Sequence, residues 1–126
     1  MPPALQRTTT VLVVEDDAQM RELHRATLRE AGYSVVAVED GLDALRYLDL
    51  HDPPAAVVLD LDLPRLRGRD VQREMAARGI DAPIVVVTGI SGPINEQDFA
   101  RVLRKPITTD GLLDAVESCL RNRRYR

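Results

Sequence analysis

The chain has 126 residues, a net charge of −3 and 44% apolar residues, which is the profile of one globular domain with a real hydrophobic core. The acidic balance gives no basic field for nucleic-acid binding, and no apolar run is long enough to cross a membrane. A single cysteine, Cys119, excludes an internal disulfide, and Met1 to Thr10 lacks the apolar core of a signal peptide, so we expect a cytoplasmic protein.

Five short apolar runs, most of them rich in valine, alternate with longer segments of helical periodicity. Uninterrupted runs of this kind are typical of strands that are covered on both faces, as in parallel sheets. The predicted strands are residues 11–14, 35–38, 55–59, 84–87 and a weaker fifth at 101–104.

Helices are predicted between the strands. Asp17 and Asp40 can cap the first two, the third spans roughly residues 69–78 before Gly79, and the last begins near Thr108. His24 and His51 are expected to be exposed on helical segments. The inward positions predicted for the first two helices are Met20, Leu23, Thr27, Ala31, Leu42, Leu45 and Leu48.

The alternating order of strands and helices predicts an α/β fold in which helices cover both faces of one parallel sheet. The connection from Gly89 to Ala100 is only 12 residues long. Because it starts with Gly89-Ile90-Ser91-Gly92-Pro93, we expect its helix to be short or irregular.

Charged and hydroxyl side chains follow four of the predicted strands. The carboxyl ends of parallel strands meet at one edge of the sheet, where such folds bind ligands. Carboxylates about 5 Å apart repel by ~3 kcal/mol per pair at an effective dielectric of about 20, so a cation or a proton must offset them. Oxygen ligands favour Mg²⁺ or Mn²⁺, and a lysine and a hydroxyl beside them suit a phosphoryl group. The residues are Glu15, Asp16 and Asp17 after the first strand, Asp60 after the third, Thr88 on the fourth, and Lys105 after the fifth.

From about Val11 to Leu120 the chain resembles the receiver domain of two-component response regulators. Each matching piece alone is weak, but four of them stand in order at the ends of four predicted strands. They are VLVVEDD (Val11 to Asp17), VVLDLDLP followed by Gly68, IVVVTG (Ile84 to Gly89) and RKP (Arg104 to Pro106).

The resemblance implies a doubly wound five-stranded parallel sheet with the flavodoxin-like strand order 2-1-3-4-5. The receiver domain would span residues 11–121, between an N-terminal tail at 1–10 and a basic tail at 122–126. Pro106 looks like the cis-proline of the family.

The resemblance also implies a signalling function. Asp60 would accept a phosphoryl group from a histidine kinase or a histidine phosphotransfer protein, and a downstream protein would read the result. Glu15 and Asp16 would hold Mg²⁺ together with Asp60 and the backbone carbonyl of Asp62. Thr88 and Lys105 would contact the phosphoryl group. The chain would catalyse only its own phosphorylation and dephosphorylation.

Two features depart from the family pattern, Val102 and the short connection from Gly89 to Ala100, and alternatives to a phosphorylated receiver stay open. Val102 stands where the family usually has an aromatic residue that rotates on activation, and Phe99 is a candidate substitute. The alternatives are a degenerate receiver that binds partners without phosphorylation and, from Asp60-Leu61-Asp62, a haloacid-dehalogenase-like phosphatase. A flavodoxin-like electron carrier is disfavoured because the acids after the first strand would repel its phosphate.

The chain is expected to be a stand-alone receiver or one excised from a longer protein. Three arginines flank the loop after Asp60: Arg65, Arg67 and Arg69. We interpret them as solvated surface charges; the alternative is that they contact an acidic partner.

Overall fold

A five-stranded parallel sheet forms the centre of the computed structural model, which describes residues 9–124. The strand order is β2-β1-β3-β4-β5, which confirms the predicted fold class and topology. The strands are β1 (Thr10–Val14), β2 (Ser34–Val38), β3 (Ala56–Leu59), β4 (Ile84–Thr88) and β5 (Arg101–Arg104).

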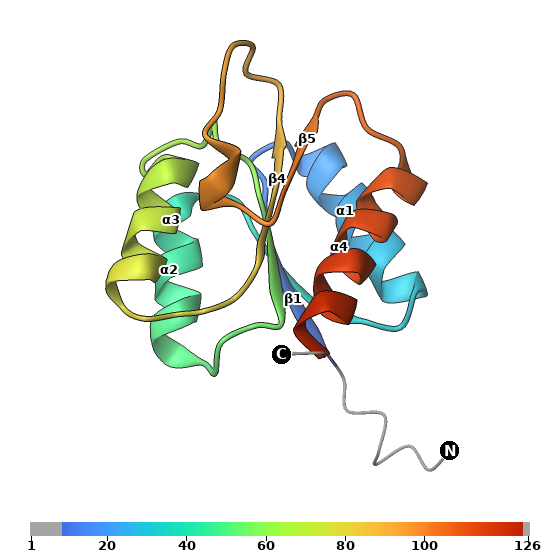
Figure 1. The fold of residues 1–126 in the computed structure, drawn as a ribbon, viewed down its shortest axis with the longest axis horizontal. Coiled ribbons are helices and arrows are strands. Elements are labelled where there is room, and N and C mark those ends of the chain that lie inside the picture. The colour runs from blue at the N-terminus through green and yellow to red at the C-terminus, as the bar shows by residue number, and fades with distance from the viewer. Residues whose placement is uncertain (1–8, 125–126) are drawn as a thin grey trace.

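Helices cover both faces of this sheet (Figure 1). On one face lie α1 (Ala18–Glu30) and α4 (Thr109–Arg124), and on the other lie α2 (Gly41–Leu50) and α3 (Gly68–Ala77). The expected tail at 1–10 includes Thr10, which belongs to β1, and its residues 1–8 lie outside the described residues. The expected tail at 122–126 overlaps the last turn of α4, and residues 125–126 are not described. Within residues 9–124, no helix combines the length and the apolar character that crossing a membrane requires.

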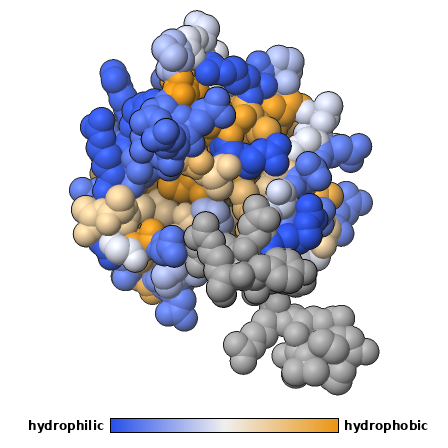
Figure 2. Space-filling view, viewed as in Figure 1, coloured by the Kyte–Doolittle hydropathy of each residue, from blue (hydrophilic) through white to orange (hydrophobic). Residues whose placement is uncertain are grey.

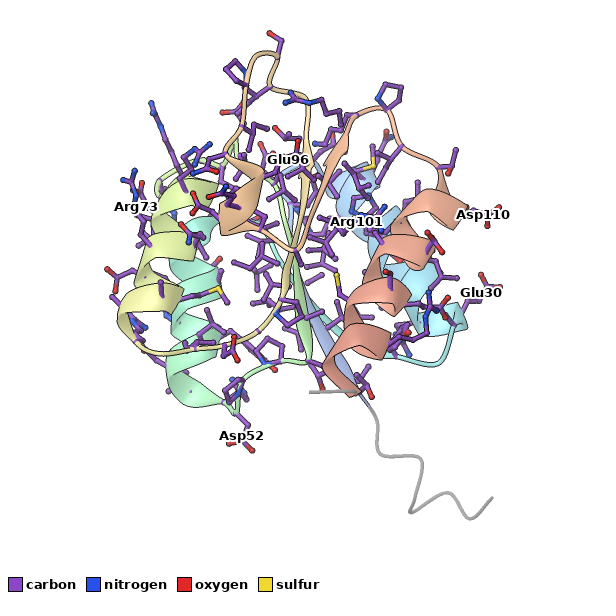
Figure 3. The ribbon with its side chains drawn as sticks, viewed as in Figure 1. Glu30, Asp52, Arg73, Glu96, Arg101 and Asp110 are labelled. Carbon is purple, nitrogen blue, oxygen red and sulfur yellow. The ribbon has the colours of Figure 1, made fainter. Side chains whose placement is uncertain are left out.

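Alternate side chains of the central strands enter two separate apolar layers. Apolar side chains fill both spaces between sheet and helices, whereas charged side chains such as Arg73 and Asp110 point outward (Figure 3). This two-sided burial explains the unbroken valine runs. The layer beneath α2 and α3 receives Leu12, Val14, Val57, Leu59 and Val86. The layer beneath α1 and α4 receives Val11, Val13, Val58, Val85 and Val87.

The predicted helix boundaries are confirmed. The side chains of Asp17 and Asp40 each accept a hydrogen bond from the amide three residues later, at 2.8 and 2.9 Å, which satisfies one free donor of each first turn. Gly32 and Gly79 follow α1 and α3 with φ angles of 104° and 70°, a left-handed conformation that glycine adopts without strain.

The predicted inward faces of α1 and α2 are partly wrong. Leu23 and Leu42 are 47% and 45% exposed, while His24, expected to be exposed, is 2% exposed. The buried stripe of α1 consists of His24 and Leu28, which lie four residues apart and therefore on the same side of the helix. Leu23 lies about 100° around the axis from His24, so its hydrophobicity does not bring it to the sheet.

His24 makes the stability of the fold depend on pH. Neither ring nitrogen has a hydrogen-bond partner among the described residues, and burial, aided by the charge of Lys105, lowers the pKa of His24 to about 4. In the unfolded chain the ordinary pKa is 6.5, so below that pH the unfolded state takes up a proton that the folded state excludes. Stability should therefore fall by about 3 kcal/mol as the pH falls from 6.5 towards 4.

Urea unfolding of the wild type and of His24→Leu between pH 7.5 and pH 4 measures this effect. The difference between the two proteins isolates His24, because all other titrating groups are common to both. We expect the leucine variant to be at least as stable at pH 7.5 and to gain on the wild type as the pH falls. Parallel stability curves for the two proteins would show that the imidazole is not held neutral.

The connection between β4 and β5 contains only one turn of 3-10 helix, η2 (Glu96–Asp98), which confirms the prediction of a short or irregular helix. Side chains fix this connection instead. The guanidinium of Arg104 donates hydrogen bonds of 2.7 and 2.8 Å to the carbonyls of Ile90 and Gly92. Figure 2 shows hydrophilic residues over α3 and more hydrophobic residues between them and α4, on the side of the molecule where β5 forms the edge of the sheet.

Phe99, the candidate for the missing aromatic switch, is 8% exposed and packs in the layer beneath α2 and α3. The guanidinium of Arg69 lies 5.8 Å from its ring centroid. The next residue, Ala100, pairs with Ile84 at the beginning of β4, whereas Thr88 is at the other end of that strand. Phe99 is therefore a core residue distant from Thr88.

Candidate functional site

The register of the sheet brings the predicted polar residues to one edge. Val14 of β1 pairs with Leu59 of β3, so the residues that follow, Glu15 and Asp60, leave the sheet side by side. The amide of Asp60 still donates to the carbonyl of Val14 at 3.0 Å. Thr88 pairs with Arg104 in the same way, which places Lys105 at this edge as well.

Lys105 joins the two buried carboxylates. Its Nζ lies 3.0 Å from Glu15 Oε1 and 3.1 Å from Asp60 Oδ2. Glu15 and Asp60 are almost wholly buried, and the lysine side chain is about a quarter exposed. The ammonium thus offsets the repulsion that two adjacent carboxylates would feel in a poorly solvated position. The peptide bond between Lys105 and Pro106 is cis, as predicted.

Burial controls the protonation of Glu15 at this edge. Desolvation raises the pKa of Glu15 to about 7, with a smaller rise from the charge of Asp60, although the hydrogen bond from the Asp17 amide and the contact with the Lys105 ammonium lower it. Burial alone would lower the pKa of Lys105, but its contacts with Glu15 and Asp60 outweigh burial and raise it. The lysine is therefore a fixed positive charge at neutral pH.

The acids at this edge form a set of oxygen donors that suits a hard divalent cation. Carboxylate oxygens of Glu15, Asp16 and Asp60 lie within 4.8 Å of one another, and Asp16 is exposed to solvent. Glu15 Oε1 is fully buried, and among the described residues its contact with Lys105 is an ion pair without the geometry of a hydrogen bond. A buried anionic oxygen without a directed donor fits a cation, and an all-oxygen set favours Mg²⁺ over softer metals.

The turn after β3 presents the Asp60 side chain. The amide of Asp62 donates to Asp60 Oδ1 at 3.0 Å, which orients the carboxylate, and the side chain of Asp62 is exposed. The turn closes where the amide of Gly68 donates to the Leu61 carbonyl at 3.1 Å. A Cβ at position 68 would lie 2.4 Å from the carbonyl oxygen of Asp60, so only glycine allows this approach.

Thr88 is completely buried at the end of β4. Its Oγ1 accepts a hydrogen bond of 3.1 Å from the amide of Ile90, so the hydroxyl oxygen supports the loop that follows, and the hydroxyl proton is not used in that bond.

The cavity at this edge, about 390 Å³ in volume, is lined by Glu15, Asp16, Asp17, Asp60, Asp62, Gly89, Ile90 and Lys105.

Two arginines near the site have contacts that the sequence did not indicate. Arg21, in the first turns of α1, reaches back to donate to the carbonyls of Glu15 and Asp16 at 3.0 and 3.3 Å. Arg65, interpreted above as a solvated charge, binds the carboxylate of Asp40. Aspartates that cap a helix are a visible signal in the sequence, but nothing in it indicates which distant arginine will pair with one.

A second group of acids lies at the start of α2, where oxygens of Glu39, Asp40 and Asp43 come within 4.8 Å of one another. Arg65 already pairs with Asp40, and its Nη2 lies 3.7 Å from Asp43 Oδ1. The guanidinium therefore supplies positive charge here, as Lys105 does at the sheet edge. The two groups differ in that, among the described residues, only the sheet edge has a buried carboxylate oxygen without a hydrogen-bond donor, Glu15 Oε1.

Comparison with known proteins matches the chain and its fold to one family. The family model described as "response regulator receiver domain" matches residues 11–117. Response regulator MprA of Mycobacterium sp. (strain KMS) is 38% identical over 116 residues, which cover 88% of this chain and 50% of that protein. MprA of Mycobacterium leprae (strain TN) is 37% identical over the same coverage. The chain thus spans about half the length of these curated relatives.

Solved structures agree with this match. The signal receiver domain of a putative Luxo repressor protein from Vibrio parahaemolyticus superposes with a TM-score of 0.85 at 27% identity and covers 94% of both chains. Response regulator protein TrrA from Thermotoga maritima, solved in complex with Mg²⁺-BeF, superposes with a TM-score of 0.80 at 28% identity and covers 90% of this chain and all of its own.

Proposed function

Because the chain belongs to the response regulator receiver domain family, we propose that it is a phosphorylation-dependent signalling switch with Asp60 as the phosphoryl acceptor. The observation that carries the proposal is the buried pair of carboxylates, Glu15 and Asp60, bridged by Lys105 at the carboxyl edge of the sheet. The phosphoryl donor is a histidine kinase or a histidine phosphotransfer protein, and a downstream protein is the receiver of the signal. The receiver unit comprises residues 11–121.

The proposed metal is Mg²⁺, held by the carboxylates of Glu15, Asp16 and Asp60 and by the backbone carbonyl of Asp62. Three of these ligands are supported by the clustered carboxylate oxygens described above. When bound, Mg²⁺ supplies positive charge against the oxygens of the transferring phosphoryl group. The complex of TrrA with Mg²⁺-BeF supports this assignment by similarity.

In the proposed reaction, a carboxylate oxygen of Asp60 attacks the phosphorus atom of a phosphohistidine. An O–P bond forms, giving an acyl phosphate, and the N–P bond breaks with its electron pair remaining on the imidazole nitrogen. Lys105, already 3.1 Å from Asp60 Oδ2, provides an ammonium contact for the phosphoryl oxygens. The hydroxyl of Thr88 donates its free proton to one of them, because its bond from Ile90 uses only a lone pair.

The switch follows from the added charge. Phosphorylation brings about −1.5 to −2 charge to a site that already holds several acids, and it draws Lys105 and Thr88 towards Asp60. The amide of Lys105 donates to the carbonyl of Thr88 at 2.8 Å, so the backbones after β4 and β5 move together. Since Val102 has no ring to rotate, the loop backbones themselves carry the change to the partner surface.

Phosphoryl uptake from acetyl phosphate, followed by intact mass spectrometry, tests the proposal. We expect the wild type to gain the mass of one phosphoryl group in the presence of Mg²⁺. Removing Mg²⁺ with a chelator should slow uptake by about a hundredfold, because the charge that stabilises the phosphoryl oxygens is lost. Uptake at an equal rate without the metal would contradict the proposed site.

A further inference from the structure

The segment between β3 and α3, residues 60–67, carries the proposed acceptor and a proposed metal ligand. It packs against the start of α2. This helix and α3 lie side by side on one face of the sheet (Figure 1). A Cβ at Gly41 would be 2.3 Å from the carbonyl oxygen of Leu66, so the two backbones are in direct contact. The contact depends on what holds residues 64–66 in place.

An ion pair holds them. Arg65 Nε donates to Asp40 Oδ2 at 2.9 Å, and its Nη2 contacts the same oxygen. The other oxygen of Asp40 caps α2 through the amide of Asp43. The Asp40 side chain is 5% exposed, so the partner of its charge matters more than it would on an open surface.

The backbone at Arg65 also depends on this contact. Among residues 9–124, Arg65 is the one residue other than glycine with a positive φ angle, 63°. Side chains with a Cβ are disfavoured in this left-handed region, so surrounding contacts must stabilise the conformation. Two contacts stabilise it: the amide of Leu66 donates to the carbonyl of Pro64 at 2.7 Å across Arg65, and the guanidinium of Arg65 donates to Asp40.

We propose that Arg65 and Asp40 form a positioning pair that sets the phosphoryl-acceptor loop for metal binding. The inference rests on the proposed function. The pair holds residues 64–66 against α2, and the amide of Gly68 donates to the Leu61 carbonyl, so both contacts restrain the turn at residues 60–62. In that conformation the Asp62 amide binds Asp60 Oδ1, and the carbonyl of Asp62 is available as a ligand.

Substitutions at both positions separate geometry from charge. Arg65→Gly relieves the left-handed backbone but removes the ion pair, Arg65→Lys keeps the charge without the fork, and Asp40→Asn keeps the cap of α2 without the charge. Arg73→Ala is the matched control, since this exposed arginine of α3 lies outside the loop. Loss of a positive charge alone strengthens Mg²⁺ binding, so weaker binding in Arg65→Gly identifies a loss of geometry.

The measurements are the dissociation constant for Mg²⁺ by calorimetry and the amide exchange rates of Asp62 and Gly68 in metal-free protein. The exchange rates are taken relative to Val58 in β3, which reports global unfolding. We expect Arg65→Gly to weaken Mg²⁺ binding by about tenfold and to speed exchange at Asp62 and Gly68 relative to Val58. Asp40→Asn should speed exchange in the same way; because it removes a negative charge, which alone weakens Mg²⁺ binding, only its exchange rates report geometry. Arg65→Lys should recover part of the loss, and Arg73→Ala should leave exchange unchanged and should not weaken Mg²⁺ binding.

Unchanged relative exchange at Asp62 and Gly68 in Arg65→Gly would overturn the positioning role, whatever the metal affinity. If the wild type binds no Mg²⁺ and takes up no phosphoryl group, the proposed function fails, and the metal-free exchange rates still decide whether the pair orders the loop.

Discussion

Replacement of Asp60 by asparagine is expected to abolish phosphoryl uptake while leaving the fold intact. The amide has the shape of the carboxylate, and it can still accept from the Asp62 amide, but it lacks the nucleophilic oxygen that forms an acyl phosphate. Lys105 retains Glu15 as a partner in the variant, so no charge is left isolated. Intact mass after incubation with acetyl phosphate and Mg²⁺ measures the loss.

Asp62→Asn is the matched control, because it removes an exposed carboxylate two residues away in the same loop. We expect this variant to take up one phosphoryl group, as the wild type does. Equal uptake by Asp60→Asn would refute the acceptor assignment. Steady turnover of a phosphomonoester that depends on Asp62 would instead favour the haloacid-dehalogenase-like reading of Asp60-Leu61-Asp62.

Gly68→Ala is expected to lower the free energy of unfolding by about 3 kcal/mol. The added Cβ would lie 2.4 Å from the carbonyl oxygen of Asp60 and 2.7 Å from Leu61 Cα. These are backbone atoms, which cannot rotate away as a side chain can. Either the start of α3 or the acceptor turn must therefore move, and urea unfolding monitored by circular dichroism measures the loss.

A second glycine provides the comparison. A Cβ at Gly111, in the first turn of α4, would meet only the side-chain oxygen of Thr108, at 3.0 Å. Alanine is a better helix former than glycine, so Gly111→Ala should change stability by less than about 1 kcal/mol. Similar losses in the two alanine variants would show that the contact of Gly68 with the acceptor turn is not what makes glycine necessary.

The sheet and the residues at its edge were predictable because both follow from short-range patterns. Valine runs indicated strands covered on both faces, and parallel order placed Glu15, Asp60 and Lys105 at the same edge. The strand order that makes them neighbours came from the resemblance to receiver domains. The short connection before β5 was predictable from Gly92 and Pro93, which exclude a helix at its beginning.

What the sequence did not reveal depends on contacts between distant segments. Arg65 and Asp40 are 25 residues apart, and their pairing depends on how the loop after β3 docks against α2. His24 was assigned to the surface because it is polar, yet the docking of α1 on the sheet buries it. The bond from Ile90 to the Thr88 hydroxyl depends on the path of the loop after β4, which no local pattern fixes.

The outer strand β5, which follows the short connection, has a consequence for how the protein behaves at high concentration. β5 is an outer strand of only four residues, and open strand edges invite the addition of strands from other copies, which is a route to aggregation. Arginines at both of its ends, Arg101 and Arg104, are exposed to solvent. An incoming strand would have to strip water from Arg101 and pack beside the Arg104 guanidinium, which donates to the Ile90 and Gly92 carbonyls, so the shortness and the charge of β5 together discourage self-association along this side.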